Sequence, residues 1–139
     1  MDCYRQAGAH PDLERALALY RRGFDRRFNS RHACAGLHFA AIEALLGRFR
    51  APGDPLPLEA LVARLLGEQD AHAQWFARDG RALRNAVAHG RAADAVEDAA
   101  LAALATIAGA AWRHAAQLHA EDPANTTRPG KRLARALSG

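Results

Sequence analysis

The sequence predicts an all-α protein, a bundle of four to five helices in one compact domain. Alanine supplies 35 of the 139 residues, whereas valine, isoleucine and threonine together supply eight. Helices favour alanine and leucine, and strands favour β-branched residues. Apolar residues also recur at intervals of three and four along several segments, which indicates amphipathic helices. A chain of this length can bury a substantial core.

The first two expected helices lie between residue 11 and about residue 49. Pro11 and Asp12 suit the first turn of a helix. Asn29 or Ser30 can cap the second helix, which runs to about Phe49 and is apolar on most sides, so we expect it at the centre of the bundle. The apolar stripe expected on the first helix consists of Leu13, Leu17, Tyr20, Phe24 and Phe28.

The remaining helices are separated by glycine and proline. A short helix begins near Pro57 and stops at Gly67. Residues 70–78 form a helical turn or two, which the pair Asp79-Gly80 breaks or caps, and a further helix then runs to Gly90. The last long helix extends from about residue 94 to residue 120. We therefore expect an N-terminal extension over 1–10, a helical domain over 11–122, and a basic tail over 123–139 that is disordered or orders late.

Charge and composition limit the binding partners and the cellular location that the sequence allows. Residues 1–122 hold 15 basic and 15 acidic side chains, so the net charge of +4 belongs to the tail and carries no general argument for nucleic-acid binding. Cys3 and Cys34 form no spaced framework, which favours reduced thiols. The start of the chain does not resemble a signal peptide, and the longest uncharged run, 14 residues, is too short to cross a bilayer. We expect a soluble, cytoplasmic protein with no membrane contact.

The stretch LRNAVAHG, residues 83–90, is the strongest candidate for a functional site. An arginine followed a few residues later by a histidine recurs in this arginine-rich chain, so the spacing alone means little. Here, however, Asn85 and His89 are four apart and share one helix face, and Arg84 can reach over the helix end. Gly90 suits the left-handed position after a helix. The negative end of the helix dipole would favour a protonated His89.

This trio suits RNA cleavage by transesterification, in which the ribose 2′-hydroxyl attacks its own phosphate. An imidazole can act as base or acid near neutral pH, and a guanidinium can bind the phosphate through a planar, charged fork. No cluster of metal-ligand residues is evident, so we expect no metal and no other cofactor. One histidine per chain is insufficient for two proton transfers. A two-fold dimer would supply a second, so we expect a homodimer.

The segment LRNAVAHGR resembles the motif of HEPN domains: an arginine, a polar residue, a few further residues and then a histidine. It is most similar to the Apea-like HEPN group, and the segment LHFAAIEALLG, residues 37–47, is similar to the second helix of that group. The resemblance covers roughly residues 11–120. It implies a helical bundle, usually dimeric, that often acts as a metal-independent endoribonuclease in toxin–antitoxin or antiphage systems.

The resemblance also implies roles for individual residues. Arg84 and His89 would be catalytic and Asn85 a polar accessory residue, while Glu43 would orient Arg84 across the bundle. Gly90 would support the site from the helix end. We further expect Arg81 and Arg91 to bind the RNA substrate.

The partner that the family suggests is an antitoxin or a nucleotidyltransferase. The family members silenced by a nucleotidyltransferase carry a tyrosine shortly after the histidine. This chain reads Gly90-Arg91-Ala92-Ala93 at that point, so we do not expect adenylylation there.

Two alternatives remain open. Residues 84–89 can be an ordinary solvated helix end, or the motif of a non-catalytic module that binds nucleotide or RNA or dimerises under a partner's control. The run YRRGFDRRFNSR, residues 20–31, alternates arginine with aromatic residues, as RNA-binding surfaces do. Its aromatics follow helical spacing, which favours aromatic side chains in the core and arginines on a solvated face. The basic tail is either a source of salt-sensitive RNA affinity or a solubilising remnant.

Overall fold

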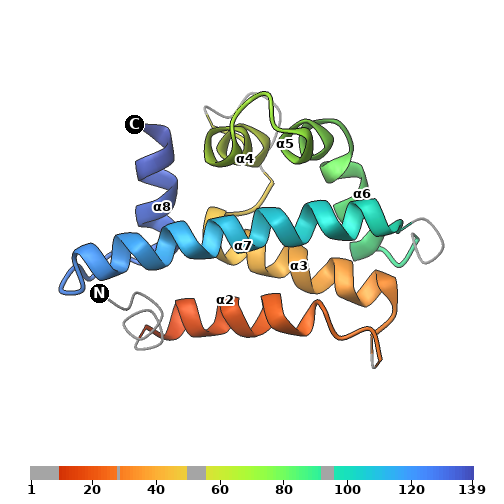
Figure 1. Ribbon diagram of the computed structural model, residues 1–139, viewed down its shortest axis with the longest axis horizontal. Coiled ribbons are helices and arrows are strands. Elements are labelled where there is room, and N and C mark those ends of the chain that lie inside the picture. The colour runs from red at the N-terminus through yellow and green to blue at the C-terminus, as the bar shows by residue number, and fades with distance from the viewer. Residues whose placement is uncertain (1–9, 28, 50–55, 92–95) are drawn as a thin grey trace.

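A computed structural model of the chain describes residues 10–27, 29–49, 56–91 and 96–139. In these ranges every regular element is a helix and no strand is present, so the all-α prediction is confirmed. Figure 1 shows α2 (Pro11–Arg22), α3 (Arg31–Leu46) and α7 (Asp98–Glu121) lying along the long axis of the molecule. None of the described helices combines the length and the apolar stretch needed to cross a lipid bilayer.

Helix α3 is the centre of the bundle, as predicted. The hydroxyl of Ser30 caps its first turn by accepting a hydrogen bond from the Ala33 N–H at 3.1 Å. The helix ends at Leu46, short of the expected Phe49, because Gly47 takes a φ of 100°. It contacts α2, α6, α7 and α8, and its buried side chains lie on most of its faces: Cys34, Ala35, His38, Phe39, Ala41, Ile42, Leu45 and Leu46.

Helix α2 is shorter than its apolar stripe predicts. The ring of His10 caps it by accepting from the Asp12 N–H, and the helix ends at Arg22. Gly23 packs so closely on His38 that a Cβ there would lie 2.5 Å from the imidazole. The chain turns at this glycine, which takes Phe24 out of the stripe, and Phe24 is 54% exposed. The assignment of Phe24 to the core is therefore wrong, and Phe28 lies outside the described residues.

Helix α4 (Leu58–Leu66) begins after Pro57 and stops at Gly67 as predicted. The expected break at Asp79-Gly80 is wrong. Helix α5 (Ala71–Trp75), the π-helical turn η1 (Phe76–Gly80) and α6 (Arg81–Ala88) follow one another without interruption, and Gly80 has helical angles (φ −60°, ψ −46°). A Cβ on Gly80 would lie 2.9 Å from the Phe76 ring. The glycine therefore permits close packing inside a helix and does not end it.

Helix α7 begins at Asp98, later than the expected residue 94, which lies outside the described residues. The chain before it is extended at Glu97 and buries Val96. Alanine fills much of the buried side of α7, which lets α3 pack close along its length. The indole N–H of Trp112 donates to the Leu13 carbonyl at 2.9 Å and ties α7 to α2.

The C-terminal segment is part of the domain, so the prediction of a disordered tail and a domain boundary at residue 122 is wrong. Helix α8 (Pro129–Ser138) packs on α3 and α7 with Leu133 fully buried. Gly130 approaches the end of α3 so closely that a Cβ would lie 2.9 Å from the Ala44 carbonyl oxygen. Helix α8 has a small, continuous apolar face that packs on the core. The basic residues on its other sides made the segment look like a solvated tail in the sequence.

Candidate functional site

The end of α6 is closed by a hydrogen-bonded cap. Gly90 has a φ of 69°, in the left-handed region, as predicted. Its N–H donates to the Val87 carbonyl at 3.2 Å, and the Arg91 N–H donates to the Ala86 carbonyl at 2.8 Å. These are the two bonds of a Schellman motif, with His89 as the last residue before the turn. A Cβ on Gly90 would meet nothing within 4 Å, so the backbone angle alone requires the glycine.

The polar and apolar residues of this segment lie on opposite sides. Asn85 and His89 are exposed. Leu83 and Val87 pack on the core, and a Cβ on Gly36 of α3 would lie 3.5 Å from the Val87 side chain. The helix end is therefore anchored to α3, and the imidazole of His89 is open to solvent.

Arg84 is held across the bundle by a residue of α3. Its Nε donates to Glu43 Oε1 at 2.9 Å, and the two side chains are 34% and 18% exposed. The contact expected from the resemblance of residues 37–47 is present. The Nη groups of Arg84 make no hydrogen bond or ion pair with other described residues, so the outer edge of the guanidinium remains available for an anion.

Arg81 has a different setting. Its guanidinium donates to Glu59 of α4 at 3.0 to 3.1 Å and lies 5.0 Å from the centre of the Phe49 ring. It precedes His89 by eight residues, or about 12 Å along the helix. Arg81 therefore ties α6 to α4, and the structure does not bring it together with His89. Arg91 is exposed beside the cap, and its expected contact with substrate stays a prediction.

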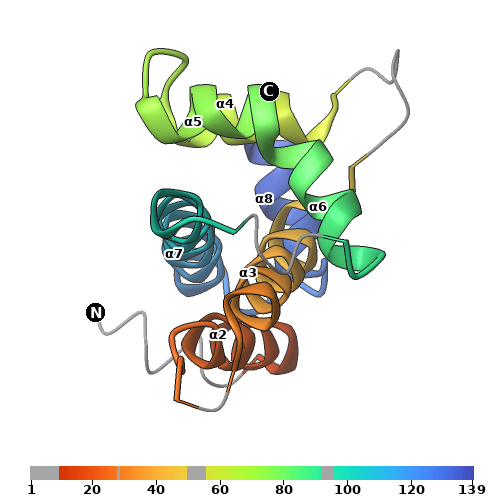
Figure 2. The same ribbon diagram turned by 90° about the vertical axis from the view of Figure 1, so that its right-hand side faces the viewer.

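The π turn before α6 sets the direction in which Arg84 points. One π turn inserts a residue relative to a regular helix and shifts the phase of the following helix by about 100°. With this shift Arg84 faces Glu43 while Asn85 and His89 face solvent. Figure 2 shows α6 descending beside α3 after this turn. The sequence carries no local signal for this arrangement, nor for Glu59 as the partner of Arg81.

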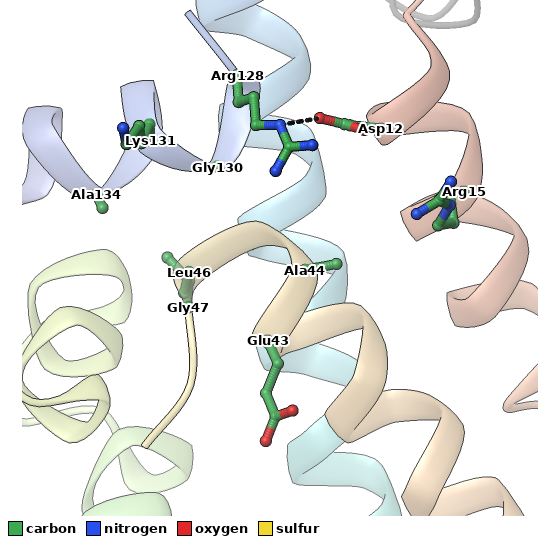
Figure 3. Close-up of a pocket in the computed structure, with 10 residues that line it drawn as sticks. All are labelled: Asp12, Arg15, Glu43, Ala44, Leu46, Gly47, Arg128, Gly130, Lys131 and Ala134. Carbon is green, nitrogen blue, oxygen red and sulfur yellow. Dashed lines mark ion pairs between the residues drawn. The ribbon is translucent and has the colours of Figure 1, made fainter. Parts of the chain in front are cut away.

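A cavity of about 410 Å³ lies between α2, the end of α3 and the start of α8, and Glu43 lines it. Arg15, Arg128 and Lys131 also line it, and Arg128 lies 3.7 Å from Asp12. Figure 3 shows the Glu43 carboxylate directed away from Arg128. Glu43 therefore lines this cavity and also holds Arg84.

The described residues contain no group of three or more histidine, cysteine, aspartate or glutamate side chains arranged to hold a metal ion. No family model, curated protein or solved structure matches the chain.

Proposed function

We propose that the protein is a metal-independent endoribonuclease of the HEPN type. The single observation that carries the proposal is the arrangement at the end of α6. Arg84 is held by Glu43 with its Nη groups uncommitted among the described residues, and His89 is exposed at the same helix end. Arg81 contacts Glu59 through both Nε and an Nη group, whereas Arg84 contacts Glu43 through Nε.

In the proposed reaction the 2′-oxygen forms a bond to the adjacent phosphorus, and the bond from phosphorus to the 5′-oxygen breaks. One imidazole takes the proton of the 2′-hydroxyl, and a protonated imidazole gives a proton to the departing 5′-oxygen. Arg84 binds the charged phosphorane. In this proposal Asn85, one turn before His89, hydrogen-bonds the ribose or the phosphate.

Two imidazoles are needed, and the motif supplies one per chain. We therefore propose a homodimer in which two α6 ends face each other across a two-fold axis and share one substrate. The exposure of Asn85 and His89 fits such a site. The resemblance suggests a cytoplasmic role in a toxin–antitoxin or antiphage system, with an antitoxin as the regulating partner.

The test is cleavage of an unstructured RNA in the presence of EDTA. We expect products with 2′,3′-cyclic phosphate ends, and rates about 10²- to 10⁴-fold lower for His89→Ala and for Arg84→Ala. Arg78→Ala is the matched control, since Arg78 is an exposed arginine of the preceding π turn. A DNA strand of the same sequence has no 2′-hydroxyl and should remain intact.

Equal cleavage by the parent and both variants would show a contaminating nuclease and remove the assignment. RNA binding without cleavage would instead identify the protein as a non-catalytic module of this type.

A further inference from the structure

Phe24 is an exposed aromatic residue in a protein that buries most of its large apolar side chains. It directly follows the turn at Gly23 and is 54% exposed. Its ring makes edge-to-face contacts with Tyr20 and with His38, each with the ring centres 5.0 Å apart. These contacts fix the ring while more than half of the residue remains open to solvent. An aromatic ring held in this way is a preformed stacking platform.

Arginines surround this ring. An open hollow of about 430 Å³ is lined by Phe24 with Arg21, Arg26, Arg27 and Asp25. Arg21 makes no ion pair with other described residues, and the same holds for the neighbouring exposed Arg22.

Arg26 pairs with Asp98 at 2.9 Å, but the two side chains are 51% and 66% exposed. Exposed pairs of this kind contribute little free energy, so Arg26 can exchange Asp98 for a stronger anion. A phosphate is such an anion, because it accepts charge-assisted hydrogen bonds from the guanidinium fork.

A second hollow, of about 220 Å³, lies on the α7 side of Phe24. Apolar residues of α7, Leu101, Ala102 and Ala105, form part of its wall together with His38. Arg26 and Asp98 also line this second hollow. Phe24 therefore borders two hollows that share Arg26, and α7 adds an apolar wall to the second. A nucleotide has matching parts, a charged phosphate that can contact the arginines and a flat base that can stack on the ring.

This surface lies at the same end of the bundle as the Arg84 and His89 site. In Figures 1 and 2 the C-terminal ends of α2 and α6 and the N-terminal ends of α3 and α7 gather there. Arg31 joins these elements, since it donates to the Val96 carbonyl at 3.3 Å and lies 3.2 Å from Asp98. Val87 of α6 packs on the same part of α3.

We infer that Phe24 and the arginines that line the hollow beside it bind unpaired RNA, with one base stacked on the Phe24 ring and the flanking phosphates on Arg21 and Arg26. The inference rests on the proposed function, because it supplies the strand that reaches His89. Stacking on an aromatic side chain requires an unstacked base, so the substrate class is single-stranded RNA or a loop. The carboxylates of an acidic protein would pair with the arginines, but they would not stack on the Phe24 ring.

The experiment measures the affinity of the full chain for a short, labelled, unstructured RNA by fluorescence anisotropy, in the His89→Ala background to prevent cleavage. Base stacking gives an expected loss in affinity of roughly five- to a hundredfold for Phe24→Leu. Phe24→Tyr keeps a ring and should keep the affinity. Thermal melting checks that both variants remain folded, and leucine retains the apolar contacts with Tyr20 and His38.

Charge variants give an independent measurement. Arg21→Ala should lower the slope of log affinity against log salt by about 0.7, the value for one phosphate contact on a single strand. Arg78→Ala, an exposed arginine on another part of the molecule, should leave the slope unchanged. Duplex RNA should lose little affinity in Phe24→Leu, because its bases are already stacked.

The outcomes separate this inference from the proposed function. RNA that binds through Phe24 but is never cleaved supports the surface and defeats the catalytic assignment. Cleavage that depends on Arg84 and His89, with equal RNA affinity for Phe24→Leu and the parent, overturns the surface alone. An equal loss in Phe24→Leu and Phe24→Tyr also overturns stacking. No RNA binding by the parent chain overturns both.

Discussion

At the end of the bundle where α7 meets α8, two arginine side chains cap helices, whereas at the opposite end several arginines are exposed. Arg132 donates to the Leu118 carbonyl at 2.6 Å and to the Asp122 carbonyl at 3.2 Å, at the C-terminal end of α7. Arg64 does the same for α8, through the carbonyls of Leu137 and Ser138 at 2.7 and 2.9 Å. Cations suit the negative end of a helix, so these arginines stabilise the fold.

At the other end, Arg21, Arg22 and Arg91 are exposed and make no ion pair with other described residues. Arg84 lies between the two cases, because one edge of its guanidinium is held by Glu43 and the other is uncommitted among the described residues. The difference teaches that the number of arginines says little about binding. What matters is whether a helix terminus or a carboxylate already occupies each guanidinium. The predictions below probe the elements at the two ends of the bundle, from the largest expected effect to the smallest.

Removing the buried leucine of α8 should give the largest loss of stability. Leu133 is fully buried, and truncation of such a side chain costs about 2 to 5 kcal/mol. We expect Leu133→Ala to lower the free energy of unfolding by this amount in urea denaturation, with RNA affinity unchanged in the remaining folded protein. Leu133→Met, which nearly conserves volume, is the control and should cost less than about 1.5 kcal/mol. A variant with parental stability would mean that α8 does not belong to the core.

Stability should fall as the pH is lowered from 6.5 to 4. Burial lowers the pKa of His38 from 6.5 to about 4. Within this window the unfolded chain binds a proton that the folded chain does not, so folding loses up to about 3 kcal/mol. Thermal melting at a series of pH values measures the effect. His38→Leu should have a flatter profile than the parent over this range, and identical slopes would contradict the role of burial.

Gly90 should be sensitive to substitution even though its surroundings are empty. An L-residue in the left-handed region costs roughly 1 to 2 kcal/mol, so Gly90→Ala should destabilise by about that amount. Gly36 is the matched control, since it lies inside α3 with ordinary contact to Val87. Gly36→Ala should be neutral or stabilise by up to about 1 kcal/mol. A Gly90→Ala variant that melts at the parental temperature would contradict the left-handed conformation.

Glu43 should affect the reaction more than the fold. Its pair with Arg84 is partly exposed, so Glu43→Gln should cost less than about 1 kcal/mol in stability. As a positioning residue it should lower kcat with little change in KM, because the amide oxygen still accepts from Arg84 but no longer holds the cation by charge. Glu59→Gln, the corresponding change at Arg81, should leave kcat unaltered. Equal effects of the two variants on kcat would remove the distinction between these pairs.

Much of the fold follows from the sequence because the signals are local. Ser30, Pro57, Gly67 and Gly90 mark helix termini through their own hydrogen-bonding groups or backbone preferences, and the structure has termini at each. The failures come from packing. Gly80 resembles a helix break in the sequence. In the structure it lies inside a helix, where the Phe76 ring occupies the space that a side chain at residue 80 would fill.

The same reason accounts for Phe24 and α8. In the sequence, Phe24 continues the apolar stripe of the first helix. In the structure, the helix has already ended where Gly23 packs closely on His38. The apolar face of α8 is short and surrounded by basic residues, so its burial depends on α3 and α7 being in place. For the candidate site, the motif singled out Arg84, Asn85 and His89, and their catalytic roles stay predictions. The positions of the Arg81 and Arg84 side chains depend on ion pairs with Glu59 and Glu43, respectively. These partners are distant in the sequence, so the motif does not reveal them.

The most direct test compares Arg84→Ala with Arg132→Ala, measuring thermal stability and RNA cleavage on the same samples. The account predicts opposite results. Arg84→Ala should melt close to the parent and lose cleavage by about 10² or more. Arg132→Ala should lose about 1 to 3 kcal/mol of stability, the contribution of charged hydrogen bonds, and cleave at the parental rate while folded. If both variants lose stability alike and cleave alike, the two ends of the bundle do not differ and the central claim is contradicted.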